Sequence, residues 1–346
     1  MRLTKILRRR IFIIAIILLN IFCYASLQIP PHIFWPAAFL SYGFPVIICL
    51  NLILLTLALI QKRLTAFIWF LFFLLGAPYL LRTLRFNNSK KLTNTVRVLS
   101  FNAKLFRMPH VYNQFSTELI NWIATDSSAI KCIQEYSTNP TWAGLDVTGQ
   151  LKAAGYDGYT YVAEVDDRQH NPGLAIFSTY KIISTGVVWH NPQSLNAAIY
   201  ADLQYGEKVI RIYNAHFTSM KLTARPDDWL GKVSYLFQQL KIGSVNRSKQ
   251  VNILLEHLKN SPYPYLVCGD FNETPYSYVY SRMRRELTNA FEERGSGFGF
   301  TLNQKPYFLR IDHQFFGKEF KLQKYSVDRS MTISDHFPTY GYYILP

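Results

Sequence analysis

The first 92 residues contain no aspartate or glutamate, and the long apolar runs within them carry no charge of either sign. Eleven Lys and Arg residues are therefore unbalanced in this part of the chain. The other 254 residues hold the remaining 26 basic side chains and all 22 acidic ones, a formal surplus of +4. The whole-chain charge of +15 belongs mostly to the N-terminal part, and the rest lacks the strong basic footprint typical of nucleic-acid-binding domains.

Cysteine is also scarce. The four cysteines form no CxxC or Cys/His spacing, which argues against a zinc site. Cys23 and Cys49 fall within apolar runs, and Cys132 and Cys268 fall within strand-like patterns. We interpret the last two as buried free thiols.

Three uncharged apolar runs occupy the N-terminal part, at residues 11–27, 33–60 and 65–81. About 20 apolar residues suffice to span the hydrocarbon core of a bilayer. The sequence therefore predicts a membrane anchor with three transmembrane helices in residues 1–92.

The orientation of this anchor follows from its flanking charges. Five basic residues precede the first run, and Lys62 and Arg63 separate the second from the third. Positively charged short loops stay in the cytoplasm, which predicts an integral protein of the bacterial inner membrane with its C-terminal domain on the non-cytoplasmic side. Arg82 and Arg85 oppose this orientation, but long domains cross the membrane largely regardless of charge. A signal peptide at residues 1–27 is the alternative, although no clear small-x-small cleavage site follows it.

Residues 93–346 read as one soluble domain in which strand-like runs outnumber helical patterns. The runs are TVRVLSF, AIKCIQ, GYTYVAEV, GLAIFS, KIISTGVVW, LNAAIYADL, KVIRIYNAHF, YPYLVCG, FLRIDHQFF, FKLQKYSV and TYGYYIL. Helical patterns occur at QFSTELINWIATD, WLGKVSYLFQQL and QVNILLEHLKN. This mixture predicts an α/β (α+β) fold of sheets with helices packed outside.

Acids, amides and imidazoles follow several of these strands. They are Asn102, Glu135, Asn214, His216, Asp270, Asn272, Asp312, His313, Asp335 and His336. Each one alone is more often a turn or cap residue than a functional group. Together they offer the hard oxygen ligands that Mg²⁺ prefers and the base and donors that phosphoester hydrolysis needs.

The segments LSFNAKLF, CIQEYS, YNAHF, CGDFNETP, RIDHQF and SDHFP, in this order, resemble the motif series of the endonuclease/exonuclease/phosphatase superfamily, the deoxyribonuclease I-like fold. The resemblance covers about Val96 to Leu345, and GSGFGFT resembles a membrane-attached bacterial branch. It implies two packed β-sheets flanked by helices, a four-layer sandwich with the site at one edge.

The resemblance also implies a metal site. Glu135 would be the principal ligand, Asn102 would lie beside it, and Asp335 would complete or support the metal shell. The expected ion is Mg²⁺, with Mn²⁺ as a substitute.

Catalytic roles follow by the same motifs. Asp270 would orient and help deprotonate the attacking water, and Asn272 would hold water or a phosphate oxygen. His336 would contact the scissile phosphate while Asp312 fixes its ring. His216 would stabilise charge in the transition state.

Two positions depart from the family pattern. His313 stands where an aromatic residue is common, and we interpret it as a packing residue rather than one that tunes the pKa of a neighbour. Thr179 replaces an arginine of the family strand. Arg168, Arg247 and Arg310 are candidates for supplying the missing positive charge.

The predicted function is a membrane-anchored, metal-dependent phosphoester hydrolase: a phosphodiesterase, nuclease or phosphatase. Motif and fold set the class of bond and not the molecule, so nucleic acid, lipid headgroup and inositol phosphate all remain candidate substrates. The bilayer is the other predicted partner, and no protein partner is predicted. The alternatives are a non-catalytic phosphate-ligand binding module and a sphingomyelinase-like phospholipid hydrolase. A transport role for the apolar part is disfavoured, because its runs contain no charge.

Overall fold

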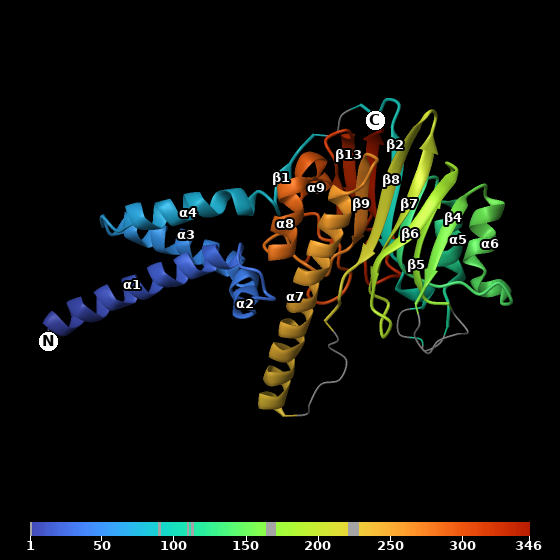
Figure 1. Cartoon of the computed structure of the whole chain (residues 1–346). Helices are drawn as coiled ribbons and strands as arrows, with labels where there is room; N and C mark the ends of the chain where they lie inside the picture. Colours follow the sequence, from blue (N-terminus) through green and yellow to red (C-terminus); the bar gives the residue numbers. More distant parts are fainter. Residues whose placement is uncertain (1, 89–90, 109–110, 112–113, 164–170, 221–227) are drawn as a thin grey trace. The chain divides into compact units, whose positions relative to one another are not determined.

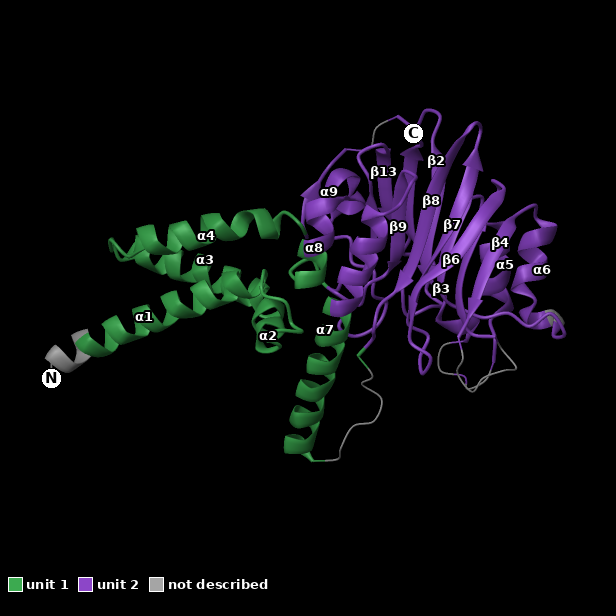
Figure 2. Cartoon of the chain, in the orientation of Figure 1, with its two compact units in different colours: residues 1–82, 220–248, 274–281 green, residues 83–219, 249–273, 282–346 purple. Residues whose placement is uncertain are grey.

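The computed structural model describes residues 2–88, 91–108, 111, 114–163, 171–220 and 228–346 (Figure 1). The chain divides into two compact units (Figure 2). The first comprises residues 1–82, 220–248 and 274–281, and the second comprises residues 83–219, 249–273 and 282–346. Residues 83–92, which the sequence grouped with the anchor, belong to the second unit.

The first unit contains the apolar helices. They are α1 (Arg2–Ser26), α2 (Pro36–Tyr42), α3 (Phe44–Ile60) and α4 (Ala66–Leu80). Among the described residues, only Leu7–Ser26 within α1 is a single helix long and apolar enough to cross a membrane. The pair α2 and α3, bent by 52°, would count as a second span if taken together. The 15 residues of α4 rise about 22 Å, which is short of the ~30 Å hydrocarbon core.

The expected module of three spanning helices is therefore corrected to one candidate span, or two if the bent pair is one. The second apolar run breaks because Gly43 separates its two helices and Pro45, near the start of α3, has no backbone N–H to donate to the preceding turn. A buried hydrogen bond joins α1 to α3: the Asn51 side chain donates to Asn20 Oδ1 at 2.7 Å.

The second unit is built on two six-stranded mixed sheets. One has the order β10-β12-β9-β8-β7-β6. Its strands are β6 (Ile182–His190), β7 (Ala197–Tyr205), β8 (Lys208–His216), β9 (Tyr265–Asp270), β10 (Thr288–Asn289) and β12 (Asp312–Phe316). The other has the order β13-β14-β2-β3-β5-β4. Its strands are β2 (Val96–Asn102), β3 (Ile130–Tyr136), β4 (Asp157–Val162), β5 (Gly173–Ser178), β13 (Lys321–Val327) and β14 (Thr339–Ile344). A short pair joins β1 (Arg85–Phe86) to β11 (Ser296–Gly297).

The main core lies between the two sheets. It combines inward residues such as Val98 and Ile176 of one sheet with Ile199 and Ile212 of the other. Alternation along each strand sends the remaining side chains to the outer faces. Burial on both faces explains why many strands are apolar along most of their length.

Helices cover the outer faces of both sheets. α5 (Thr117–Thr125) and α6 (Val147–Ala153) pack their apolar sides onto the sheet that contains β2 and β3. On the other sheet, the C-terminal half of α7 (Trp229–Lys259) lies over β8, where the Tyr213 hydroxyl pairs with His257 Nδ1 at 2.9 Å. The two helical patterns predicted separately for residues 229–259 form this single helix. The expected sandwich of two sheets flanked by helices is confirmed (Figure 1).

Candidate active site

The topology brings four strand ends together at one edge of the sandwich. β2 and β3 run parallel in one sheet, and β8 and β9 run parallel in the other. Asn102, His216 and Asp270 are the last residues of β2, β8 and β9, and Glu135 is next to last in β3. Asp312 begins β12 directly opposite Asp270 in the antiparallel pairing. Five of the predicted side chains thus share this edge.

Glu135 reaches the site through a β-bulge. Strict alternation along β3 directs Cys132 and Gln134 inward and Ile133 outward, so Glu135 would also point outward. Instead the pairing register shifts between Ile133 and Tyr136, and Glu135 has φ 45°. Two consecutive side chains, Gln134 and Glu135, therefore face the other sheet, as bulges beside active sites commonly allow.

Asn102 links two of the acids. Its amide nitrogen donates to Glu135 Oε1 and to Asp270 Oδ2, each at 3.1 Å. Its Oδ1 accepts the backbone N–H of Lys104 at 3.0 Å. The short amide thereby holds two carboxylates from different sheets next to each other.

His216 faces the same two acids. Its Nε2 lies 3.7 Å from Glu135 Oε1 and 3.7 Å from Asp270 Oδ2. Its Nδ1 lies 3.3 Å from the Leu195 carbonyl, which assigns the Nδ1 proton to that bond. The buried Nε2 then has no hydrogen-bond partner among the described atoms. A lone pair facing two carboxylates leaves a gap that suits a cation or a bridging water.

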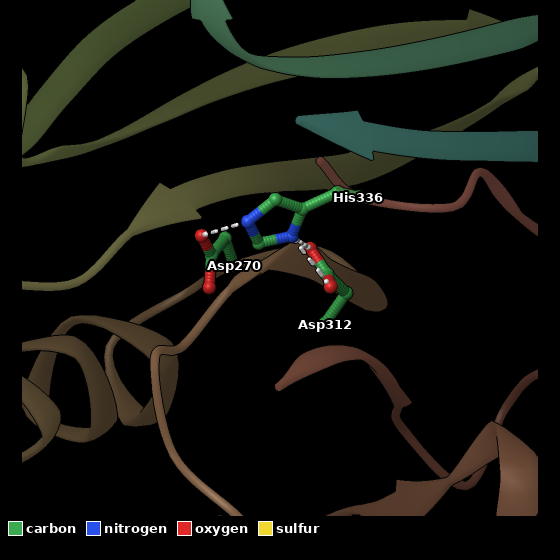
Figure 3. Close-up of side chains that lie close together, drawn as sticks. All are labelled: Asp270, Asp312 and His336. Atoms are coloured by element: carbon green, nitrogen blue, oxygen red, sulfur yellow. Dashed lines mark hydrogen bonds and ion pairs between the residues drawn. The ribbon is translucent and has the colours of Figure 1, made fainter. Parts of the chain in front are cut away.

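His336 and Asp312 form a buried pair (Figure 3). His336 Nδ1 lies 3.1 Å and 2.9 Å from the two carboxylate oxygens of Asp312, and its Nε2 lies 3.7 Å from Asp270 Oδ2. Burial alone would lower the pKa of His336, but the negative charges of Asp312 and Asp270 raise this pKa well above its ordinary value. The two carboxylates therefore favour the protonated ring. The Thr301 hydroxyl accepts the backbone N–H of Asp312 at 3.1 Å and fixes the start of β12.

Asp270 lies at the centre of the cluster. Burial raises the pKa of its carboxyl, the Asp312 charge raises it further, and His336 and His216 offset part of the rise. A carboxylate with increased proton affinity is a better general base toward water. The backbone N–H of Asn272 donates to Asp270 Oδ1 at 2.8 Å, while its side chain donates to the Phe217 carbonyl at 3.1 Å.

The donor set fits a divalent cation. Asp270, Asp312 and His336 have potential ligand atoms within 4.8 Å of one another. A protonated imidazole cannot bind a metal, however, and His336 Nδ1 already pairs with Asp312. The oxygens of Glu135 and Asp270, beside the unpaired His216 Nε2, fit a hard cation better. Asn102 presents its NH₂ there, and only a flip of the amide would present its oxygen.

Asp335 occupies a different position from the other predicted ligands. Its Oδ2 lies 3.1 Å from Nζ of Lys104, a residue that the sequence analysis did not single out. Lys104 follows Asn102 by two positions within LSFNAKLF, and that proximity was the available signal. The metal role of Asp335 stays a prediction.

The remaining candidates lie away from the cluster or outside the described residues. His313 is buried, donates from Nε2 to the Glu273 carbonyl at 2.8 Å and packs against Phe271, and burial with the Arg310 charge lowers its pKa to about 3. A neutral, packed ring agrees with the packing interpretation. Arg310 stacks over Phe291, Arg247 donates to Tyr42, and Arg168 falls outside the described residues.

Comparison with known proteins identifies a family for most of the second unit and a separate domain at the N-terminus. Residues 99–336 match the endonuclease/exonuclease/phosphatase family, and residues 4–83 match a domain of unknown function (DUF8431). No curated protein matches the chain.

Solved structures of low sequence identity share the fold. An endonuclease/exonuclease/phosphatase from Beutenbergia cavernae is 15% identical, with TM-score 0.55 over 73% of this chain and 72% of the other. One from Bacteroides vulgatus is 18% identical, with TM-score 0.52 over 73% and 100%. The human Nocturnin catalytic domain with bound sulfate is 16% identical, with TM-score 0.53 over 75% and 98%.

The family match covers more than half of the chain, and its residues include the acids, amides and imidazoles gathered at the sandwich edge. The chain therefore belongs to the endonuclease/exonuclease/phosphatase family and is a hydrolase of phosphoric esters.

Proposed function

We propose that this protein is a divalent-metal-dependent phosphoester hydrolase that is anchored in a membrane by its N-terminal helices. The observation that carries the catalytic part is the chain of contacts that runs from Glu135 through Asn102 to Asp270 and on to the His336–Asp312 pair. These groups come from both sheets, and each has a task in hydrolysis.

Glu135 and Asp270 would hold Mg²⁺ or Mn²⁺, with Asn102 and Asp335 in support. When bound, the ion supplies charge neutralisation at the phosphoryl oxygens. Asp270 orients the attacking water and takes up its proton. The cationic His336, held by Asp312, donates a hydrogen bond to a non-bridging phosphate oxygen, and His216 stabilises the charge of the transition state when its Nε2 carries a proton.

The anchoring proposal rests on α1. Its stretch Leu7–Ser26 has the length and hydropathy of a span, and several of its apolar side chains are exposed. The flanking basic residues favour an inner-membrane protein with its catalytic unit on the non-cytoplasmic side. A signal sequence passes the same test of length and hydropathy, so retention of α1 in the mature protein needs N-terminal sequencing.

The test is turnover by the full-length protein in detergent on a panel of phosphate esters. The panel contains single- and double-stranded DNA, RNA, sphingomyelin, glycerophospholipids, inositol phosphates and bis(p-nitrophenyl) phosphate. We expect cleavage of at least one substrate that EDTA abolishes and Mg²⁺ or Mn²⁺ restores. The matched controls are His336→Ala, which should be inactive, and His313→Gln, which should keep turnover.

Two results would overturn the proposal. The first is turnover that persists in EDTA or in His336→Ala. The second is binding of a panel member without turnover in either metal, which would favour the non-catalytic binding module. Cleavage restricted to sphingomyelin would single out the phospholipid hydrolase.

A further inference from the structure

The N-terminal half of α7, residues 229–248, is an amphipathic segment that belongs to the first unit. At about 100° per residue, six large apolar side chains fall on one side of the helix. They are Trp229, Leu230, Val233, Leu236, Phe237 and Leu240. The opposite side carries polar residues such as Gln238 and Gln239, with Ile242 as the exception.

This apolar side is largely uncovered. Trp229 is 76% exposed, Leu230 is 78% exposed, and Leu236 and Phe237 are also exposed. A contiguous apolar surface of this kind marks an interaction site in a folded protein.

Contacts within the first unit fasten this helix half to the segment that links α1 to α3. Two of these contacts involve aromatic rings: the rings of Phe39 and Phe237 stack 4.7 Å apart, and Lys241 Nζ lies 5.1 Å from the centre of the Trp35 ring. The other two are hydrogen bonds. Arg247 donates to the Tyr42 hydroxyl at 2.8 Å, and the His32 backbone N–H donates to Ser248 Oγ at 3.1 Å. The linking segment begins where the candidate span α1 ends, and it exposes Ile33 and Phe34. The apolar side of α7 therefore continues an apolar surface at the end of a membrane helix.

The charges along the helix itself have one sign, and Asp228 directly before it accepts the Gly231 backbone N–H at 2.7 Å. No Asp or Glu occurs between Trp229 and Leu255, whereas Lys232 and Lys241 flank the two edges of the apolar side. Lysines at such edges reach toward anionic headgroups while their stems lie along the apolar surface. A second copy docked face to face would bring these lysines together, and the exposed Ile33 and Phe34 extend the apolar surface to the end of the candidate span α1, so a bilayer is the favoured occupant.

We propose that residues 229–248 of α7 form an interfacial helix that inserts Trp229, Leu230 and Phe237 among the acyl chains of an anionic phospholipid bilayer. This proposal rests on the proposed anchoring by α1. It adds a second, peripheral attachment supplied by the catalytic part of the sequence.

The test uses full-length protein reconstituted into vesicles of phosphatidylcholine and phosphatidylglycerol. Brominated acyl chains quench tryptophans inside the bilayer, and acrylamide quenches those in water. We compare wild type with Trp229→Phe and with the matched control Trp142→Phe, which removes a tryptophan 46% exposed in the second unit. Trp229→Phe should lose bromolipid-quenched emission, Trp142→Phe should lose acrylamide-quenched emission, and Lys232→Glu with Lys241→Glu should reduce bromolipid quenching of Trp229.

Equal bromolipid quenching in wild type and Trp229→Phe would overturn the proposal. So would protection of Trp229 from acrylamide in detergent that appears only as the protein dimerises with rising concentration, because a second copy would then cover the face. Co-sedimentation of wild type with vesicles separates the two proposals: a chain that fails to co-sediment refutes the anchoring as well, whereas one that co-sediments without quenching of Trp229 refutes only the interfacial helix.

Discussion

Replacing Asp312 by asparagine tests the chemistry of the site most directly. The change keeps the shape of the side chain and removes the charge that holds His336 protonated. Opposite unit charges 2.9 Å apart attract by about 6 kcal/mol at an effective dielectric constant of about 20. Removing one partner of a buried pair typically costs about 3–5 kcal/mol, since the other charge is left uncompensated.

The pKa of His336 should therefore fall in Asp312→Asn, which favours the neutral ring. A neutral ring loses its hydrogen bond to the phosphate or presents the wrong tautomer, and we expect turnover to fall by about 10²–10⁴-fold. Initial rates at saturating Mg²⁺, with the substrate that the panel identifies, measure this loss. Circular dichroism checks that the variant still unfolds cooperatively.

The matched control is Asp202→Asn. Asp202 forms a buried two-point ion pair with Arg211 at 2.6 Å and 2.7 Å, on the same pair of strands that carries His216. Breaking it should also cost about 3–5 kcal/mol of stability while leaving the site assembled. Equal rate losses in the two variants would mean that Asp312 acts only on stability, and unchanged turnover in Asp312→Asn would refute the reasoning altogether.

Three further predictions follow from described contacts. Gly269→Ala would place a Cβ 2.0 Å from the Ala215 carbonyl oxygen, so β8 and β9 must separate and turnover should be lost. Gly206→Ala, whose Cβ would lie in open space, is the control and should keep turnover. Retained turnover in Gly269→Ala would contradict this prediction. The raised pKa of His336 stabilises the metal-free fold fully below about pH 6.5, and this contribution is lost as pH rises through the folded pKa. Denaturant unfolding in EDTA should therefore show a free energy of unfolding that falls as pH rises above about 6.5 in wild type, and falls less steeply in Asp312→Asn. If the free energy of unfolding changes with pH in the same way in both proteins, His336 is not the cause. Asn20→Ala should lower the free energy of unfolding in detergent by about 0.6–2 kcal/mol, because it removes the hydrogen bond between α1 and α3. The control Thr56→Ala, at an exposed position of α3, should leave this free energy unchanged. Equal effects of the two variants would show that the Asn20–Asn51 hydrogen bond adds no stability.

Strand content was predictable because the strands are short, apolar and separated by turn residues, whereas the two-sheet sandwich was implied by the resemblance to the family. Six motifs in family order then fixed which strand ends meet. The apolar N-terminal part was less predictable, because composition counts apolar residues and does not register a bend. Gly43 and Pro45 divide the second run into two helices, and α4 ends after 15 residues.

Within the site, residues at strand ends were predictable and contacts between strands were not. Lys104 was missed because a lysine next to a strand end is usually a solvated surface residue, and only the fold brings it to Asp335. The same limit applied to Glu135. Alternation assigns it to the outer face of β3, and the sequence gives no sign of the extra residue that turns it inward.

The bulge at Glu135 separates two tasks that one strand position would otherwise share. Gln134 donates to Asn214 at 2.6 Å and joins the two sheets, while Glu135 faces the acids of the reaction centre. Cohesion and chemistry thus reside on neighbouring residues that can change independently. Loss of one residue before Glu135 would restore regular pleating and leave one inward position where the strand now has two, so the link to Asn214 and the acid could not both be kept. The site therefore depends on the count of residues in the strand as much as on their identity.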